Sequence, residues 1–355
     1  MTPCNSPSFD GHESISSYFD KRSGLACIVA IHSTARGPGA GGCRMLPYSN
    51  WEAALDDALQ LSRAMSLKSA IAGLDLGGAW SVIIGDSRSK KTPALFEAYG
   101  RVVNTFDGRF WAIVDVGTTA LDLVHARKYS AYVTGLDGHP AASGDPSPVT
   151  AESVFRSIQI AVKKCYGSSL SGVSVAVQGV GQVGASLTKK LMAAGARPVI
   201  ADTCESTIRR VADETGARVV VPEDILGQNV EIFCPCALSG AISAANLDRL
   251  RARVVVGGAN NQLADEDLGK ALLERGVFYA PDYVANAGGI IHIAGEIRAI
   301  HAGSQFDPDW VHGKIDQLTV TLDDIFEQSL AERRPTNEIA DAIAKKRLTQ
   351  VAARH

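Results

Sequence analysis

Residues 173–184 read VSVAVQGVGQVG, and this stretch decides the fold of the second half of the chain. Val173–Val177 is a short apolar run of the kind that forms a buried strand. It leads directly into the pattern G-x-G-x-x-G, and a helical segment, 182–194, follows at once. A strand, a glycine-rich turn and a helix in this order are typical of a Rossmann fold and predict dinucleotide binding.

Each glycine of the pattern has its own physical role. Gly179 permits the tight turn, Gly181 lets the backbone approach a diphosphate, and Gly184 lets the helix pack close to the strand. The diphosphate would lie at the positive N-terminus of the helix, so Gln182 and Val183 are further cofactor-binding candidates. A glycine-rich turn without a ligand is the plainer alternative.

Asp202 is the acid expected to hold the ribose of the cofactor. It follows the next strand candidate, Pro198–Ala201, about 20 residues after the glycine pattern. A carboxylate there accepts hydrogen bonds from ribose hydroxyls and repels the 2′-phosphate of NADP. Because Arg209 and Arg210 lie further along, NAD is expected rather than NADP.

Short apolar strands and helical segments alternate through the rest of this region. The further strand candidates are 219–221, 231–233, 254–256 and 277–279. This alternation predicts βαβ units and a doubly wound parallel sheet, so we assign residues 146–304 to a Rossmann NAD-binding domain. Three helical stretches follow, over 290–301, 310–327 and 338–352.

The first 145 residues predict a second α/β domain, built on a mixed sheet. Asn50 is placed to cap a helix, and strands are expected at 15–19, 26–31, 82–84 and 109–116. Residues 140–150, PAASGDPSPVT, are predicted to link the domains. We expect a substrate and oligomerisation domain over 1–145, joined by the C-terminal helices at about 305–355, with a cleft between the two domains.

Composition and charge exclude several classes of protein. The 355 residues carry a formal net charge of −3, so no nucleic-acid or membrane partner is expected. The seven cysteines are irregularly spaced and the eight histidines show no ligand spacing, so no metal is expected. The chain begins without a signal-peptide pattern, and no apolar run reaches the ~20 residues of a membrane span. A cytoplasmic location is therefore expected.

Long, ordered blocks of the sequence resemble the Glu/Leu/Phe/Val amino-acid dehydrogenase family, nearest to its leucine dehydrogenases. They include GPGAGGCR at 37–44, RAMSLKSA at 63–70, LDLGGAWSVII at 74–84, DVGTT at 115–119, CPCALSGAI at 234–242, GGANNQLAD at 257–265 and APDYVANAGGII at 280–291. The resemblance implies interconversion of an amino acid with a 2-oxo acid plus ammonia, using NAD(P). It also implies a homo-oligomer formed through the first domain, for which we expect edge pairing of strand 26–31.

The resemblance also assigns roles residue by residue. Lys68 matches the lysine that pairs with the substrate carboxylate, and Asp115 matches the catalytic carboxylate. The alternatives are a solvated surface lysine and an aspartate that caps a helix starting near Thr118 or Thr119. The other substrate-binding candidates are Gly41, Gly42, Met65, Ile113, Asn261 and Val284, and the other cofactor-binding candidates are Thr150, Cys236, Ala237, Asn260 and Asn286.

One departure from the family pattern changes the expected chemistry. The family motif is G-G-G-K, whose lysine activates water, whereas this chain has Gly77-Gly78-Ala79-Trp80. An indole offers only an N–H donor, and loss of a general base costs roughly 10²–10⁴-fold in rate. Ile113 stands where a small residue would line the pocket, so together with Trp80 it predicts a narrower, drier site. Drift after loss of activity is the alternative explanation.

Two functions remain in competition. The first is an NAD-dependent oxidoreductase that transfers hydride at the α-carbon of an amino or imino acid and, without the base, reduces a ready-made imine. Trp80 would then stack on a planar substrate. The second is a catalytically inactive NAD-binding homologue that serves as a regulatory or partner subunit. A 2-hydroxyacid dehydrogenase is disfavoured, because the sequence offers no matching set of His, acid and Arg.

Overall fold

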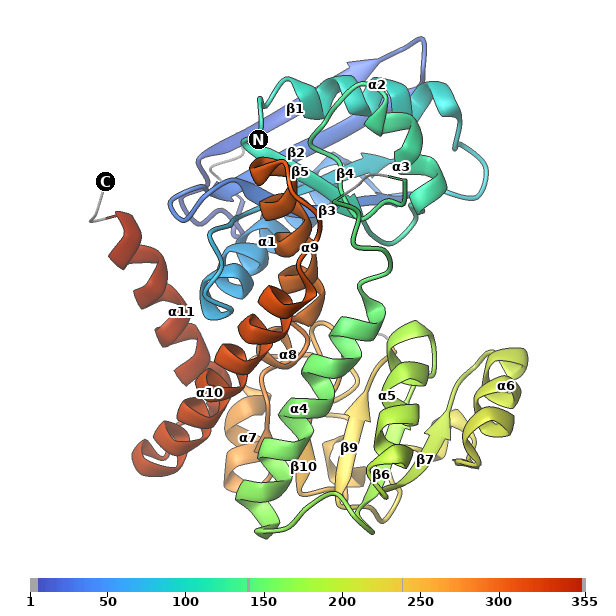
Figure 1. Ribbon diagram of the computed structural model, residues 1–355, viewed down its shortest axis with the longest axis vertical. Coiled ribbons are helices and arrows are strands. Elements are labelled where there is room, and N and C mark those ends of the chain that lie inside the picture. The colour runs from blue at the N-terminus through green and yellow to red at the C-terminus, as the bar shows by residue number, and fades with distance from the viewer. Residues whose placement is uncertain (1–5, 139–140, 238, 353–355) are drawn as a thin grey trace. The chain divides into compact units, whose positions relative to one another are not determined.

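The computed structural model describes residues 6–138, 141–237 and 239–352 (Figure 1). These residues form two compact units. Unit 1 contains the described residues up to Asp145, Ile290–Val311, and the described residues from Ala344 onward; unit 2 contains Pro146–Gly289 and His312–Ile343. Most of the N-terminal stretch read for a signal peptide, together with Pro140 of the expected linker and Leu238, lies outside the described residues.

Unit 1 is built on a five-stranded mixed sheet with the order β1-β2-β4-β3-β5. The strands are β1 (Ser14–Asp20), β2 (Leu25–Ser33), β3 (Gly39–Leu46), β4 (Gly77–Ile84) and β5 (Phe110–Val114). β2 pairs antiparallel with β1 and β4, whereas β3 runs parallel to β4 and β5. The expectation of a mixed α/β sheet in this part of the chain is thus confirmed.

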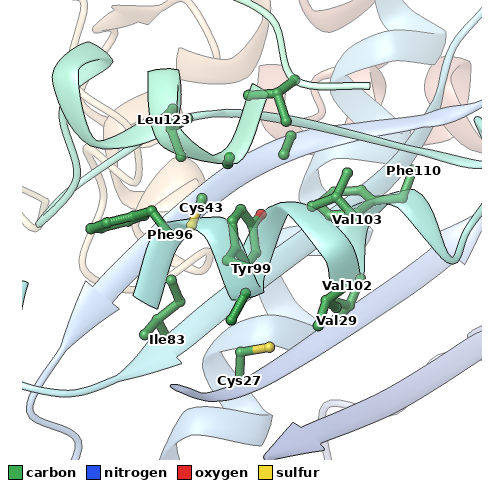
Figure 2. Close-up of a cluster of buried hydrophobic side chains, with 14 of the residues drawn as sticks. Cys27, Val29, Cys43, Ile83, Phe96, Tyr99, Val102, Val103, Phe110 and Leu123 are labelled. Atoms are coloured by element: carbon green, nitrogen blue, oxygen red, sulfur yellow. The ribbon is translucent and has the colours of Figure 1, made fainter. Parts of the chain in front are cut away.

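Helices cover both faces of this sheet. α1 (Trp51–Ile71) packs on one face, and α2 (Pro93–Asn104) and α3 (Ala120–Arg127) pack on the other. The Asn50 side chain accepts a hydrogen bond from the Ala53 N–H, which confirms the predicted helix cap. Figure 2 shows the core under α2, where Tyr99 lies among buried side chains. The Tyr99 hydroxyl lies 2.7 Å from the hydroxyl of Ser81.

The structure contradicts the expectation that strand 26–31 pairs at a subunit edge. These residues belong to β2, which is hydrogen-bonded along both sides, to β1 and to β4. The strand is apolar because it is central, and a central strand has no unpaired backbone groups to offer a partner. The free edge on this side of the sheet belongs to β1.

Unit 2 carries a six-stranded, wholly parallel sheet with the order β11-β10-β9-β6-β7-β8. The strands are β6 (Ser174–Gln178), β7 (Arg197–Ala201), β8 (Arg218–Val219), β9 (Ile232–Pro235), β10 (Val254–Val255) and β11 (Phe278–Tyr279). The chain starts in the middle at β6, builds outward in one direction and then returns to build in the other. This is the doubly wound order that the sequence predicts, and it places a switch point beside β6.

The helices of unit 2 precede, connect or follow these strands. They are α4 (Ser147–Tyr166), α5 (Gln182–Ala193), α6 (Glu205–Thr215), α7 (Leu268–Glu274) and α8 (Asp282–Ala285), with short 3₁₀ turns at Pro222–Asp224 and Leu247–Arg249. α5 follows β6 directly and α6 follows β7, as expected of βαβ units. The strand and helix that flank the glycine pattern are therefore those inferred from the sequence.

The C-terminal helices are shared between the units rather than joining the first one as a block. They are α9 (Gly288–Ala302), α10 (Pro308–Glu332) and α11 (Thr336–Ala352). The middle of this region, His312–Ile343, belongs to unit 2. Ion pairs hold this region to the rest of unit 2, because Lys164 of α4 contacts Asp323 and Glu327 of α10. Tyr283 likewise donates to Asp341 of α11.

A pair of histidines, His12 buried and His32 largely buried, connects the N-terminal segment to α1 in unit 1. The rings of His12 and His32 meet edge to face at 4.9 Å. His12 Nε2 lies 3.1 Å from the Leu59 carbonyl oxygen, and His32 Nδ1 lies 2.8 Å from Ser66 Oγ. Asp10 and Arg63 are the charged groups that face the pair. Burial lowers the pKa of His32 to about 4 and also lowers the pKa of His12, so both rings are neutral at neutral pH.

This histidine pair predicts an acid-sensitive fold. An unfolded histidine binds a proton below about pH 6.5, whereas folded His32 resists protonation until about pH 4. Stability is therefore complete above about pH 6.5 and falls as the pH drops toward 4, by on the order of 2 kcal/mol at pH 5 for His32. Urea unfolding at about pH 7.5 and pH 5 measures the loss. His32→Gln should reduce this loss of stability, while His312→Gln, at an exposed position, should leave it unchanged. Equal losses of stability in both variants would contradict a role for His32 in the acid sensitivity.

Candidate functional site

One face of the unit 1 sheet gathers the side chains expected to carry the chemistry. Successive side chains of a strand point to opposite faces. Cys43, Ala79 and Ala112 lie in the core under α2 and α3. Their neighbours Gly42, Arg44, Trp80 and Ile113 therefore face α1, from the adjacent strands β3, β4 and β5. Asp115, which directly follows β5, reaches the same face through its contact with Arg44.

Asp115 is held in a turn between β5 and α3. Its backbone N–H donates to Thr118 Oγ1 at 3.1 Å, and the Thr118 hydroxyl lies 2.8 Å from the Cys43 carbonyl oxygen. The cap of α3 is Thr119, which forms a reciprocal capping box with Asp122. The alternative role considered for Asp115, capping of this helix, is thus filled by another residue, and its carboxylate is available for other contacts.

Arg44 is the residue of this face that the sequence reading missed. Its Nε donates to Asp115 Oδ2 at 2.7 Å, and its Nη1 lies 3.1 Å from both carboxylate oxygens of Asp57 in α1. The Tyr48 hydroxyl donates to the same Asp57 at 2.5 Å. Although burial works against its charge, the nearby carboxylates raise the pKa of Arg44. The available signal was that Arg44 ends the quoted block GPGAGGCR, two residues after Gly42.

Trp80 occupies the space directly over Gly41 and Gly42. A Cβ added to Gly42 would lie 2.6 Å from the indole Cζ2 and 2.7 Å from Asp115 Cβ. One added to Gly41 would lie 1.7 Å from the Ala79 carbonyl oxygen and 3.1 Å from the indole Cε3. The indole is 8% exposed and packs with the apolar side chains of α1. Its Nε1 is buried and finds no acceptor among the described residues. The two glycines that the resemblance assigns to substrate binding therefore lie under a tryptophan side chain.

The other candidates of unit 1 flank this arrangement. Met65 of α1 is half-buried against the cluster that contains Trp80. Lys68 follows one helical turn later and is also half-buried. Ile113 pairs with Gly42 across β3 and β5, and its Cγ2 would lie 3.7 Å from a Cβ at Gly135. The narrower site expected from the bulk of Trp80 and Ile113 stays a prediction.

The glycine pattern of unit 2 has the geometry that its sequence predicts. Gly179 has φ +89°, and a Cβ there would lie 2.7 Å from Ala237 Cβ. A Cβ at Gly184 would lie 2.0 Å from the Gly179 carbonyl oxygen, so the helix approaches the turn as closely as the backbone allows. At Gly181, by contrast, a Cβ would meet nothing within 4 Å. The exposed N-terminus of α5, with Gln182 and Val183, thus has open space for a diphosphate.

Asp202 lies beside this turn and is anchored by backbone groups. Its Oδ2 accepts the N–H of Val180, and its Oδ1 accepts the N–H of Cys204, both at 2.8 Å. The carboxylate is thereby fixed next to the glycine pattern, with further lone pairs for hydroxyl groups. The turn, the helix terminus and the acid together fit a dinucleotide.

The remaining cofactor candidates form a second loop cluster in unit 2. The Gly258 N–H lies 3.4 Å from Cys236 Sγ. Asn286 Nδ2 donates to Asn260 Oδ1 at 2.9 Å, while its buried Oδ1 lacks a partner among the described residues. Asn260 and Asn261 are exposed, and Asn261 adopts φ +50°.

Two candidates of unit 2 are engaged locally. The Thr150 hydroxyl donates to the Pro146 carbonyl oxygen at 3.0 Å in the first turn of α4. Val284, expected to touch substrate, is fully buried in α8 and exposes no surface to a ligand.

Across the described ranges, no group of three or more His, Cys, Asp or Glu side chains is arranged to hold a metal ion. In the same residues, no helix is both long and apolar enough to cross a membrane.

Comparison with known proteins gives a consistent set of relatives. The Glu/Leu/Phe/Val dehydrogenase dimerisation domain matches residues 14–136, and the Glutamate/Leucine/Phenylalanine/Valine dehydrogenase domain matches residues 200–354. Leucine dehydrogenase of Geobacillus stearothermophilus is 42% identical over 330 residues, 93% of this chain and 88% of the relative. Phenylalanine dehydrogenase of Lysinibacillus sphaericus is 42% identical over 292 residues, covering 81% and 77%.

Solved structures agree with the sequence relatives. The crystal structure of L-tryptophan dehydrogenase from Nostoc punctiforme superposes with a TM-score of 0.81 at 36% identity, covering 96% of this chain and 97% of that one. A hetero-hexameric glutamate dehydrogenase from Thermus thermophilus gives a TM-score of 0.80 at 22% identity, covering 96% and 89%, and so shares the fold.

The geometry of the glycine pattern separates binding from folding in a matched pair of variants. Gly181→Ala should leave the unfolding midpoint unchanged, because open space surrounds the new methyl group, but should weaken NADH binding about tenfold by blocking the approach of the diphosphate. Gly184→Ala should lower stability by about 1–3 kcal/mol through overpacking against Gly179. Fluorescence titration with NADH and thermal unfolding measure the two effects. Unchanged NADH affinity in Gly181→Ala would argue against a dinucleotide at this turn.

Proposed function

Because the chain belongs to the Glu/Leu/Phe/Val dehydrogenase family, we propose that it is an NAD-dependent oxidoreductase acting at the α-carbon of an amino or imino acid. We further propose that its chemistry is altered toward reduction of a ready-made imine. The observation that carries this proposal is Trp80, whose buried indole lies over Gly41 and Gly42 where the family motif has a lysine. Deamination needs a base for water, and an indole cannot accept that proton.

Imine reduction avoids the step that this chain cannot perform. Hydride adds to the imine carbon and a proton adds to the nitrogen, so no water is activated and no ammonia leaves. Asp115 lies on the sheet face beside the indole, and we assign its carboxylate to the N–H of the protonated imine. Lys68, half-buried on α1, is assigned to the substrate carboxylate.

NAD is the proposed source of hydride, bound by residues of unit 2. The Gly179–Gly184 turn and the N-terminus of α5 would hold the diphosphate, and Asp202 would accept hydrogen bonds from the ribose. The cofactor-facing loops would include Cys236, Ala237, Asn260 and Asn286. Asp202 favours NAD over NADP because its carboxylate repels a 2′-phosphate.

A second candidate function is a catalytically inactive NAD-binding subunit. The specific observation in its favour is that the Trp80 indole contacts Gly41 and Gly42 closely enough to fill the space above them. A chain with that space filled retains its dinucleotide site, which belongs to unit 2 and does not depend on Trp80. It would then regulate or support an active partner.

Turnover assays decide between these functions. The purified protein should oxidise NADH, and NADPH more slowly, with cyclic imines such as 1-pyrroline-2-carboxylate. NADH oxidation should be slower by about 10²-fold or more with 2-oxo acids plus ammonia, because the base that activates water is absent. Trp80→Lys should gain oxidative deamination of branched or aromatic amino acids, with Trp80→Phe as the control that restores no base.

The outcomes are distinct. Efficient ammonia release from an ordinary amino acid by the unmodified protein contradicts the proposal of altered chemistry. NADH binding without turnover of any imine or oxo acid favours the inactive subunit.

We also propose that the chain forms a homo-oligomer through the edge of β1. The family domain matched by residues 14–136 is described as a dimerisation domain, and β1 exposes Phe19 at 69%. The Glu13 N–H donates to the His32 carbonyl oxygen, so with the alternation of an antiparallel pair the Ser16 N–H points away from β2.

The β1 edge therefore offers a clean test. Ser16→Pro removes an outward N–H and should shift the protein to a smaller species in sedimentation velocity, while Ser16→Thr, which keeps the N–H, should not. Circular dichroism checks that both variants are folded. An oligomer that persists in folded Ser16→Pro shows that another surface forms the contact.

A further inference from the structure

The guanidinium of Arg44 connects two carboxylates of the unit 1 site. Arg44 Nε is 2.7 Å from Asp115 Oδ2, and Arg44 Nη1 is 3.1 Å from both oxygens of Asp57. All three side chains are partly buried, with 19–25% of their surface exposed. Ion pairs of this kind have fixed geometry, because the guanidinium fork is planar and each N–H points in one direction.

The indole of Trp80 supports this guanidinium from one side. Arg44 Cζ lies 5.5 Å from the centre of the Trp80 ring, within the range of a cation–π contact. Such contacts strengthen when they are desolvated, and Trp80 is almost completely buried. The residue that replaces the family lysine therefore contacts the arginine that holds Asp115.

Only one oxygen of Asp115 is used by this arrangement. Oδ2 is bound by Arg44, whereas Oδ1 accepts no hydrogen bond from the part of the chain that the structure describes. The turn at Thr118 fixes the backbone of Asp115, and Arg44 fixes its side chain. One carboxylate oxygen is thus held in a defined direction without a donor of its own.

We propose that Arg44 is a positioning residue: held by Trp80 and Asp57, it orients Asp115 so that Oδ1 receives an N–H of a cationic ammonium or iminium group. This rests on the proposed function and specifies its ligand class. A carboxylate only accepts hydrogen bonds, so it favours the nitrogen of an amino or iminium acid over the carbonyl oxygen of a 2-oxo acid. Arg44 carries one charge against the two carboxylates that it contacts, which leaves negative charge to attract a cation.

Ligand binding in complexes that cannot react tests this inference. L-amino acids are titrated with NADH present, and the corresponding 2-oxo acids with NAD present and ammonia absent. Three probe pairs span the sizes: L-alanine with pyruvate, L-leucine with 4-methyl-2-oxopentanoate, and L-tryptophan with indole-3-pyruvate. Isothermal titration calorimetry gives the dissociation constant of each ligand for the unmodified protein and each variant.

The expected result is a selective loss. Arg44→Met should weaken binding of the best-bound amino acid about tenfold or more, and should change binding of the corresponding 2-oxo acid by less than about threefold. Arg44→Lys should restore part of the lost affinity. Tyr48→Phe, which removes one donor from Asp57, should give a smaller loss of the same selectivity and remains informative if Arg44→Met fails to fold. Trp80→Leu should resemble Arg44→Met because it removes the ring but keeps apolar bulk.

A matched control uses an equivalent contact elsewhere. Arg101 Cζ lies 4.8 Å from the ring centre of Tyr129. Tyr129→Leu should leave the affinities for the amino acid and for the 2-oxo acid unchanged. Equal weakening of amino and 2-oxo acids in the Arg44 and Tyr48 variants, or no amino-acid binding by the unmodified protein, overturns the inference. Selective amino-acid binding without turnover refutes the catalytic proposal alone and supports the role of Arg44.

Discussion

The contact between the Trp80 indole and the backbone of β3 constrains everything else in the unit 1 site. Gly42 has no side chain, and a methyl group there would collide with the indole and with Asp115. The indole can therefore approach the strand only because Gly42 leaves room, while Gly41 lets the Ala79 carbonyl of β4 come close. In this chain, positions that the family resemblance links to substrate binding accommodate a side chain of the protein itself.

Beside that contact, Asp57 and Asp115 share one arginine partner. Arg44 supplies the positive charge that contacts both carboxylates, and its guanidinium lies against the new aromatic surface. Arginine suits this role better than lysine because it binds two carboxylates at once and stays charged. The face thus presents a carboxylate that is fixed by an arginine next to a buried indole.

Glycines make room for different groups in the two units. In unit 2, Gly184 lets α5 approach the turn at Gly179, and Gly181 leaves open space for a ligand. In unit 1, the space above Gly41 and Gly42 is occupied by the indole. The dinucleotide half therefore keeps an open binding geometry, while the half expected to bind substrate is more closely packed. Both candidate functions are consistent with a preserved dinucleotide half. They differ over unit 1, because only the enzyme needs space there for a substrate.

The sequence by itself determined the features that depend on local pattern. The alternation of strands and helices predicted the parallel sheet of unit 2, the G-x-G-x-x-G spacing predicted the turn before α5, and Trp80 was recognised where the family has a lysine. Tertiary structure alone decided which residues meet. Asp115 lies 71 residues after Arg44 in the sequence. β2 is central only because β4 pairs beside it. Strand order and side-chain contacts arise from packing between distant segments, and such contacts leave no local periodicity in the sequence to detect.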